Sequence, residues 1–169
     1  GIPLPIWCSE DGKEILVIGS VKELYTEIKK SIQSGFMKKN PFSKFVVDDF
    51  SESNYEKIDL HKHIVDEIIL VSKTGKPLYR EADLIDVWFD SGSMPYAQWH
   101  YPFENHDKFD GSFPVDYICE AVDQTRGWFY SLMAVSTTVF DSICYRRCLS
   151  LGHILDKDGK KMSKSRGNV

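Results

Sequence analysis

The residues best suited to chemistry form a basic cluster near the C-terminal end of the chain, with four cations within seven residues: Lys160, Lys161, Lys164 and Arg166. Ser163 and Ser165 lie among them, and Asp158–Gly159 predicts a turn just before them. Lysines supply point charges and serine hydroxyls supply hydrogen bonds, so this combination suits a polyphosphate. The alternative is a solvated basic loop, which is the usual interpretation of a lysine-rich turn.

A second polar group, Glu120, Asp123 and Gln124, follows an apolar run that predicts a strand over 116–120. The Glu120 carboxylate can accept hydrogen bonds from hydroxyls or an amine, and the Gln124 amide can donate to a carboxylate or a phosphate. Asp123 is a good N-cap for a helix over 123–140, whose free amides favour an anion. A solvated Glu120 and a purely capping Asp123 are the structural alternatives.

Two tryptophans accompany this group. Trp88 lies in the aromatic segment 86–98, and Trp128 lies on the apolar stripe of the helix predicted over 123–140. Large aromatic side chains most often belong to a core. The sharper alternative is that both indoles form the wall of a pocket for an aliphatic ligand, and the residues alone leave both interpretations open.

The elements that must position these residues form a βαβ pattern. The strand over 116–120 and the helix over 123–140 are followed by an apolar run over 149–155, which predicts a short buried strand. Such a unit has parallel strands joined by a right-handed crossover, and ligands bind outside the carboxyl ends of its strands. The carboxylates and the basic cluster should therefore project from the same edge.

The region 9–85 is typical of a small α+β module. Its expected elements are strands over 14–19, 67–72 and 78–80, a turn over 74–77, a helix over 21–34 and an irregular connection over 39–59. Ser20 and Glu23 form a capping-box pattern at the start of the helix, and Gly35 is a plausible stop. Nothing in this region demands chemistry, so packing or spacing is its preferred role.

Composition narrows the class of protein. The chain has 169 residues, of which 42% are hydrophobic, so it can build a core and disorder is unfavoured. The formal net charge of −4 argues against nucleic-acid binding over the whole surface, so any such contact should be local. No apolar run reaches membrane-spanning length.

The cysteines indicate a compartment and argue against a metal site. The four cysteines form no Cys-x-x-Cys pair, which leaves a zinc knuckle poorly supported: they are Cys8, Cys119, Cys144 and Cys148. Free thiols without a disulfide framework point to the cytosol. We therefore expect a cytoplasmic protein with no metal held by this chain.

Three motifs occur in order: Trp-Phe-Asp-Ser-Gly-Ser-Met-Pro-Tyr-Ala-Gln at 88–98, Asp-Gln-Thr-Arg-Gly-Trp-Phe at 123–129 and Lys-Met-Ser-Lys-Ser at 161–165. Together they resemble the isoleucyl-tRNA synthetases, a family of class I aminoacyl-tRNA synthetases. The resemblance covers nearly the whole chain and is tightest from Asp86 onward. The valyl and leucyl relatives share the last motif. Both ends of the chain look cut, so we expect a piece of a longer protein.

The resemblance implies an α/β fold. Residues 86–169 would form the second half of a Rossmann-like nucleotide-binding catalytic domain, and residues 9–85 a small α+β connective module before it. Residues 1–8 would be the segment that returns from the family's editing domain into the catalytic domain.

The resemblance also implies roles for single residues. Glu120 would contact the aminoacyl-adenylate with Asp123 and Gln124 beside it, and Trp88 and Trp128 would flank the isoleucine side chain. The catalytic residues would be Lys161 and Lys164, which would hold ATP phosphates together with Ser163. The segment of Gly152, His153, Ile154 and Leu155 would pass near the adenine.

The implied activity is that of an isoleucine–tRNA ligase, which activates isoleucine with ATP and passes it from the adenylate to tRNA(Ile). Its substrates would be L-isoleucine, tRNA(Ile) and ATP with Mg²⁺, with no tightly bound cofactor, and the missing N-terminal half of the catalytic domain would be a partner. Two alternatives remain. The piece is a non-catalytic structural module, or the parent is a valyl or leucyl relative.

The chain departs from the family pattern at two positions. Ala121 stands where the family usually has glycine, which weakens the expectation of a close backbone approach to the ribose. The second cysteine that some relatives place after Cys8 is missing, so no zinc is expected here.

Overall fold

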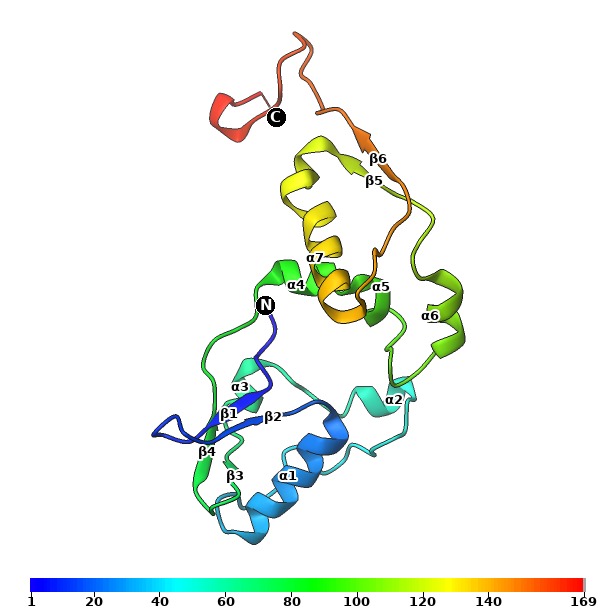
Figure 1. The fold of residues 1–169 in the computed structure, drawn as a ribbon. Coiled ribbons are helices and arrows are strands. Elements are labelled where there is room, and N and C mark those ends of the chain that lie inside the picture. The colour runs from blue at the N-terminus through cyan, green and yellow to red at the C-terminus, as the bar shows by residue number, and fades with distance from the viewer. Residues whose placement is uncertain (169) are drawn as a thin grey trace. The chain divides into compact units, whose positions relative to one another are not determined.

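A computed structural model describes residues 1–168 and divides the chain into two compact units, Gly1–Ile85 and Asp86 onward (Figure 1). Each unit has its own hydrophobic core. None of the helices described in residues 1–168 is both long and apolar enough to cross a membrane.

The first unit is built on a four-stranded sheet in the order β2-β1-β4-β3, with every pairing antiparallel. Its strands are β1 (Ile6–Cys8), β2 (Ile15–Val17), β3 (Leu70–Val71) and β4 (Pro77–Arg80). Residues 1–8, expected as a separate return segment, thus contribute an inner strand. Trp7 explains why β1 lies there, because its indole is buried and its Nε1 donates a 2.8 Å hydrogen bond to the Ile68 carbonyl.

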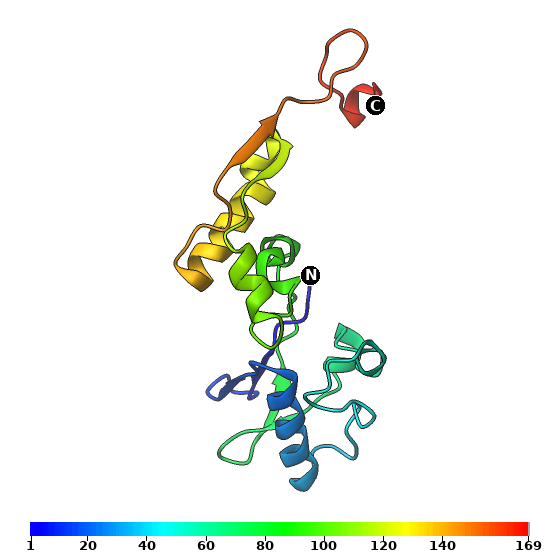
Figure 2. The same cartoon turned by 90° about the vertical axis from the view of Figure 1, so that its right-hand side faces the viewer.

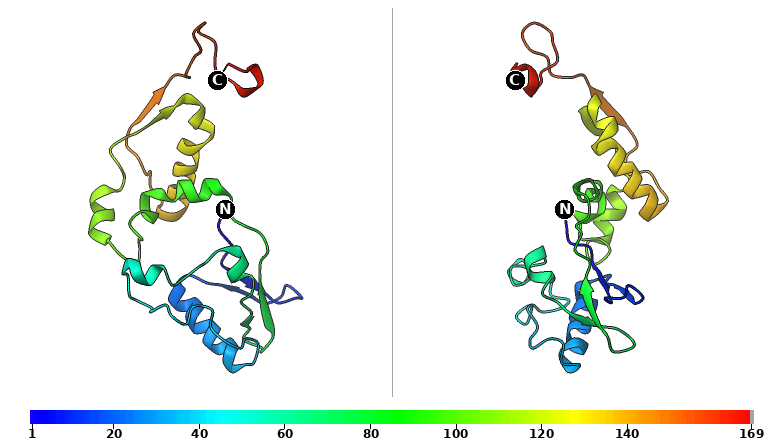
Figure 3. Two further views of the ribbon diagram at one scale, coloured as in Figure 1. Left: turned by 180° about the vertical axis from the view of Figure 1, so that it is seen from behind. Right: turned by 90° about the vertical axis from the view of Figure 1, so that its left-hand side faces the viewer.

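Helix α1 (Val21–Gln33) confirms the helix predicted over 21–34 and packs against the sheet at β3 (Figure 3). The Ser20 hydroxyl accepts from the Glu23 amide at 3.1 Å, as predicted for an N-cap. The Glu23 carboxylate reaches past Ser20 and accepts from the Gly19 amide at 2.7 Å, so the capping box is displaced by one residue. Gly35 ends the helix at a φ of +81°, a conformation that costs glycine no steric strain.

The strand predicted over 67–72 is wrong at its start, because only Leu70 and Val71 form β3. The preceding helix α3 (Lys62–Val65) continues into turns. In these turns the Glu67 and Ile68 amides donate to carbonyls of the last helical residues, so neither residue joins the strand. The hairpin from β3 to β4 is confirmed, with Leu70 opposite Leu78.

The connection predicted as irregular over 39–59 contains a short helix, α2 (Glu52–Tyr55). Its organising residue is Asn54, whose side chain is fully buried. Its Oδ1 accepts from the Val46 amide at 2.9 Å, and its Nδ2 donates to the Val46 and Asp49 carbonyls at 2.8 and 2.7 Å. A buried amide that satisfies three backbone groups orders a segment that lacks periodicity.

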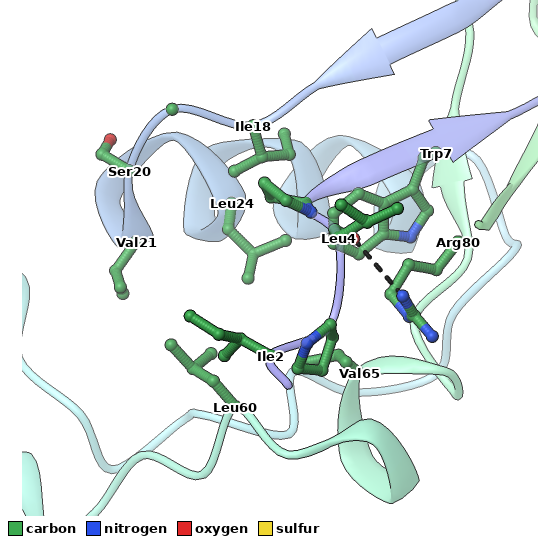
Figure 4. A pocket seen from close by; sticks show the side chains of 13 residues that line it. Ile2, Leu4, Trp7, Ile18, Ser20, Val21, Leu24, Leu60, Val65 and Arg80 are labelled. Carbon is green, nitrogen blue, oxygen red and sulfur yellow. Dashed lines mark hydrogen bonds between the residues drawn. The ribbon is translucent and has the colours of Figure 1, made fainter. Parts of the chain in front are cut away.

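The first unit also contains an apolar cavity of about 200 Å³ (Figure 4), lined by Ile2, Leu4, Trp7, Leu24, Leu60 and Val65 among others. Arg80 is the charged residue of its wall. The Arg80 guanidinium is buried, pairs with Asp66 and donates to the Leu4 and Asp83 carbonyls at 3.4 and 3.2 Å. Arg80 therefore links the segment before β1, through Leu4, to the chain after β4, through Asp83.

The second unit confirms the predicted βαβ unit. Its strands β5 (Ile118–Ala121) and β6 (Cys148–Leu151) pair in parallel, and helix α7 (Trp128–Phe140) connects them (Figure 2). The remaining elements are α4 (Val87–Gly92), α5 (Met94–Ala97), α6 (His106–Ser112) and the 3₁₀ helices η1 (Val122–Arg126) and η2 (Lys164–Arg166). No helix was predicted between residue 86 and the strand predicted over 116–120, so α4, α5 and α6 were missed.

Several boundaries in this unit differ from the prediction, and the strand predicted over 116–120 runs over 118–121. The helix predicted over 123–140 begins at Trp128, because the chain first forms η1 and then breaks at Gly127. The strand predicted over 149–155 ends at Leu151, and its burial was wrong, since all four residues of β6 are exposed. The core explains this exposure, because α7 packs its Phe129 and Leu132 against Ile118 of β5.

Glycine permits the close packing of α4 on α7. A Cβ atom at Gly92 would lie 2.7 Å from the Ser131 carbonyl oxygen and 2.9 Å from Val135 Cγ2. Both contacts are shorter than real Cβ contacts allow, so only glycine fits without displacing α7. This crossing determines how near the start of α4 lies to the start of α7.

Candidate functional site

The polar groups predicted from sequence follow the carboxyl ends of two paired strands. Glu120 lies within β5 opposite Ser150, and Ala121 lies opposite Leu151, so the two strands end at the same level. Asp123 and Gln124 follow at once in η1. The segment from Gly152 to Asn168 continues from the end of β6 (Figure 1). The register therefore brings the acidic group and the basic segment to one end of the strand pair.

Gln124 does the capping that was predicted for Asp123. The side-chain Oε1 of Gln124 accepts a 2.8 Å hydrogen bond from the Trp128 amide, which is the first residue of α7. Asp123 is exposed and makes no cap to α7, because the intervening 3₁₀ turn moves the start of the helix five residues along the chain. A sequence pattern cannot show this, since glutamine is not a typical N-cap residue.

The two tryptophans come together through α4 and α7. The Asp86 carboxylate caps α4 by accepting from the Trp88 amide at 2.7 Å. The Trp128 indole donates from Nε1 to the Ser91 carbonyl at 3.1 Å, which ties α7 to α4. A Cβ atom at Gly127 would lie 3.2 Å from Trp88 Cη2 and 2.6 Å from Gln124 Oε1. The Trp88 ring and the Gln124 amide thus converge on the same glycine.

The two indoles differ in environment. Trp88 is 48% exposed, which does not fit a core residue. Trp128 is partly buried and lines a mostly apolar cavity of about 340 Å³ with Met94, Leu132 and Tyr145 among others. Trp88 does not line that cavity and instead lies against Gly127, the residue before Trp128, so the two rings do not line one pocket among the described cavities.

The basic segment forms a hairpin. Leu155 and Lys161 make a β-bridge, the Asp156 amide donates to the Lys160 carbonyl at 2.8 Å, and the turn predicted at 158–159 is confirmed with Gly159 at a φ of +75°. Beyond it, Lys164 opens η2. The Lys161 ammonium lies 2.9 Å from Nε2 of His153. The structure therefore places Lys160 and Lys161 on the hairpin, and Lys164 and Arg166 on a separate turn.

The residues predicted near adenine lie between β6 and this hairpin. Gly152, His153, Ile154 and Leu155 are all exposed and follow the end of β6 as an extended segment. A Cβ atom at Gly152 would meet nothing within 4 Å, so a side chain at this position would have open space around it.

Two site residues were missed by sequence reasoning, Asp156 and Asn168. Asp156 Oδ1 accepts from the Asp158 and Lys160 amides at 2.9 and 2.8 Å, and its Oδ2 accepts from Asn168 Nδ2 at 2.5 Å. The Asn168 side chain is the largest cause of a lowered Asp156 pKa, followed by the Lys160 amide. The sequence Asp-Lys-Asp-Gly is a signal for Asp156, because aspartate often bonds the amide two residues on in a turn.

The described residues can also be compared with the requirements of a metal site. Residues 1–168 contain no group of three or more His, Cys, Asp or Glu side chains arranged to hold an ion. The four cysteines are free thiols, and burial raises the pKa of the Cys144 thiol.

Comparisons with known proteins give named relatives. The chain is 58% identical over its whole length to an isoleucine–tRNA ligase of Bacteroides fragilis, and 55% identical to one of Porphyromonas gingivalis. It spans only 15% of the length of each.

A solved structure is similar in fold. It is a ternary complex of an Agrobacterium radiobacter K84 LeuRS with tRNA and LeuAMS, with a TM-score of 0.57 and 18% sequence identity over 99% of this chain and 20% of the other. The family model described as tRNA synthetases class I (I, L, M and V) matches residues 1–169. The chain belongs to the class I tRNA synthetases.

Proposed function

We propose that this chain is part of an isoleucine–tRNA ligase, which forms isoleucyl-adenylate from isoleucine and ATP and transfers it to tRNA(Ile). One observation carries the proposal: the β5–β6 register sends Glu120–Gln124 and the lysine hairpin out from the same strand ends. The identity of 58% to a curated isoleucine–tRNA ligase favours isoleucine over valine and leucine.

The fold assignment follows from the same unit. We assign residues 86–169 to the second half of a Rossmann-like catalytic domain, since β5, α7 and β6 form a parallel βαβ unit of the type that binds nucleotides at its carboxyl edge. Residues 9–85 are the connective module, and residues 1–8 lead into it as β1. In this assignment the exposed face of β6 receives the missing half of the domain.

We assign recognition of the amino acid to the residues around Gly127. Trp88 and Trp128 flank the aliphatic side chain of isoleucine, and the open side of Trp88 supplies contact area. Glu120 and Asp123 accept hydrogen bonds from the amine and the ribose hydroxyls. Gln124 uses Oε1 for the α7 cap, so its Nε2 is the atom that donates to the substrate.

We assign the phosphate chemistry to the hairpin and to η2, the turn that follows it. The isoleucine carboxylate oxygen attacks the α-phosphorus of ATP, the bond from that phosphorus to the oxygen bridging it to the β-phosphate breaks, and pyrophosphate leaves with the magnesium that ATP brings. Lys161 and Lys164 neutralise the growing charge, and Ser163 donates a hydrogen bond. Gly152 to Leu155 pass the adenine. No covalent enzyme intermediate is required, so positioning carries the rate.

Transfer to tRNA and the compartment belong to the same proposal. The acidic net charge restricts any tRNA contact of this chain to a local surface. The free thiols suit a reducing cytoplasm. The alternative of a non-catalytic module applies to the 169-residue piece alone: with 15% of the length of its relatives, it should show no activation by itself.

The test is isoleucine-dependent exchange of labelled pyrophosphate into ATP by the full-length protein that contains this chain. Exchange with isoleucine well above valine and leucine supports the proposal. A folded full-length protein that exchanges better with valine or leucine contradicts it. Turnover by the isolated 169-residue chain would overturn the second part, that the piece alone is inactive.

A further inference from the structure

Asp156 and Asn168 enclose the basic segment. Their side chains are joined across twelve positions by the 2.5 Å hydrogen bond from Asn168 Nδ2 to Asp156 Oδ2. The chain between them contains Lys161, Ser163 and Lys164 of the proposed phosphate site. We call this pair the Asp156–Asn168 clasp.

Each partner of the clasp also holds backbone. Asp156 Oδ1 accepts from the Asp158 and Lys160 amides and so fixes the turn of the hairpin. Asn168 Oδ1 accepts from the Ser163 amide at 2.9 Å, and its Nδ2 lies 3.4 Å from the Lys161 carbonyl. The clasp therefore restrains the chain on both sides of Lys161 and just before Lys164.

The chemistry of the clasp is directional. A backbone amide only donates and an ionised carboxylate only accepts, so the residue between them must accept on one side and donate on the other. The Asn168 carboxamide does both. An aspartate at 168 would place two carboxylates face to face, and an asparagine at 156 would place two amide donors face to face.

Attraction between Asp156 and nearby lysines is not what holds the clasp. Among the ion pairs of residues 1–168, none includes Asp156, although Lys157 and Lys160 are close in sequence. The contacts of the Asp156 carboxylate are two amides and one carboxamide. Hydrogen-bond geometry, not net charge, is therefore the property that a variant should test.

We propose that Asp156 and Asn168 are positioning residues that hold Lys161 and Lys164 in one pre-organised arrangement for the phosphates of ATP. This inference rests on the proposed function of the lysine hairpin. With the clasp closed, the segment that bears both ammonium groups moves as one ordered piece, and binding ATP costs less ordering of the chain. The lysines contact the phosphates, while the clasp acts through them.

The experiment uses three variants of the full-length ligase: Asp156→Asn, Asn168→Asp and the double variant that exchanges the two residues. Each single variant should slow isoleucine-dependent exchange about tenfold, the loss expected when about 1.4 kcal/mol of positioning is removed. The exchanged pair should recover to within about threefold of the unmodified enzyme. In that variant the carboxamide at position 156 can donate to the carboxylate at position 168, which still accepts from the Ser163 amide.

Charge alone predicts a different pattern. Asp156→Asn removes a negative charge near phosphate and Asn168→Asp adds one, so a pure charge effect would act in opposite directions on the two singles. The matched control is Asp158→Asn, which makes the same charge change on the same turn, keeps the backbone amide that donates to Asp156, and should leave exchange nearly unchanged. Opposite effects of the singles, or no recovery in the exchanged pair, would overturn the proposal.

A second readout is independent of catalysis. The segment contains Lys160, Lys161, Lys164 and Arg166, so trypsin cuts there at a rate that reports how ordered the loop is. Both single variants should be cut faster, and the exchanged pair at the original rate. If the single variants are cut faster and the exchanged pair is cut at the original rate, the clasp is supported even if the unmodified enzyme fails to use isoleucine. If cutting is unchanged in an enzyme that does use isoleucine, the clasp is refuted and the proposed function still stands.

Discussion

Gln124 and Trp128 are linked by a 2.8 Å hydrogen bond from the Trp128 amide to the Gln124 side-chain Oε1. The bond joins the polar group after β5 to the helix that carries an indole of the proposed amino-acid pocket. In the proposed function, one carboxamide therefore serves both substrate recognition and helix capping: its oxygen caps α7, and its nitrogen is left for the ligand.

The first prediction separates these two uses. Gln124→Glu keeps an acceptor for the Trp128 amide but removes the donor, so thermal unfolding of the chain should change little while isoleucine affinity of the full-length ligase falls about tenfold. Gln124→Ala should lose both the acceptor and the donor. The free energy of unfolding should then also fall by about 1 kcal/mol, as for other lost helix caps. Equal isoleucine affinity in the glutamate variant and the unmodified enzyme would remove Nε2 from the binding site.

The second prediction concerns Gly127, which lies against the Trp88 ring and the Gln124 side chain. Gly127→Ala adds a Cβ atom 2.6 Å from Gln124 Oε1 and 3.2 Å from Trp88 Cη2, so one of these groups must move. We expect a loss of about 1–3 kcal/mol in unfolding free energy. Isoleucine affinity should fall with it, while ATP affinity changes little. Denaturant unfolding and equilibrium binding measure the two effects.

Gly111→Ala is the matched control for that substitution. Gly111 lies in α6, and a Cβ atom there meets nothing within 4 Å. The same change should therefore stabilise the chain by about 0.5–1 kcal/mol, because alanine loses less backbone entropy in a helix. If both variants shift stability in the same direction, the crowding argument at Gly127 is wrong.

Periodicity and capping patterns predicted the elements whose signals are local. The helix beginning at Val21, the β3–β4 hairpin and the parallel β5–β6 pair follow from apolar spacing and turn residues. The start of α7 could not be predicted in this way, because the residue that caps it is Gln124, and glutamine is not a typical N-cap residue. Local rules fail where a side chain four residues away decides the boundary.

The candidate site divides in the same way. The lysines and the carboxylates were found from residue type and order, whereas the Asp156–Asn168 clasp depends on two side chains meeting across a hairpin. The buried Asn54 in the first unit is another case, since its three backbone contacts order a segment without periodicity. Asparagine looks like a loop residue in sequence, and only its surroundings reveal what it holds.

The third prediction concerns acid. Hydrogen bonds from Asn168 and then from the Lys160 amide lower the pKa of Asp156. A carboxyl whose pKa is lower in the folded than in the unfolded state stabilises the fold. The stabilisation is complete at pH values above the unfolded-state pKa of about 3.9, and it is lost as the pH falls through the lower folded-state pKa. The order of the hairpin should therefore be constant at neutral pH and fall only in strong acid.

Carbon-13 NMR of the Asp156 carboxyl measures this directly. Its titration midpoint should lie below the usual aspartate value and move upward in Asn168→Ala, since Asn168 is the largest cause of the shift. The same midpoint in both proteins would mean that the side-chain contact contributes nothing to the ionised state.

The fourth prediction tests the lysines themselves. Charge builds on the phosphates mainly in the transition state, so Lys164→Ala in the full-length ligase should slow adenylate formation on the order of a hundredfold or more. Isoleucine affinity should change little. Lys161→Ala is the comparison on the same segment. Lys161 differs from Lys164 in the structure without ATP, because its ammonium contacts His153 and must leave that partner to reach a phosphate. Single-turnover adenylate formation is measured for both variants, with isoleucine affinity measured separately.

A solvated lysine predicts a different result. Lys164 opens η2 with its side chain on an exposed turn, and if it only interacts with water, removing it leaves the rate nearly unchanged. Near-normal adenylation by Lys164→Ala would remove that residue from the catalytic set. If Lys161→Ala alone were slow, the phosphate contact would belong to the hairpin arm beside His153, and the turn that begins at Lys164 would serve only to connect it to Asn168.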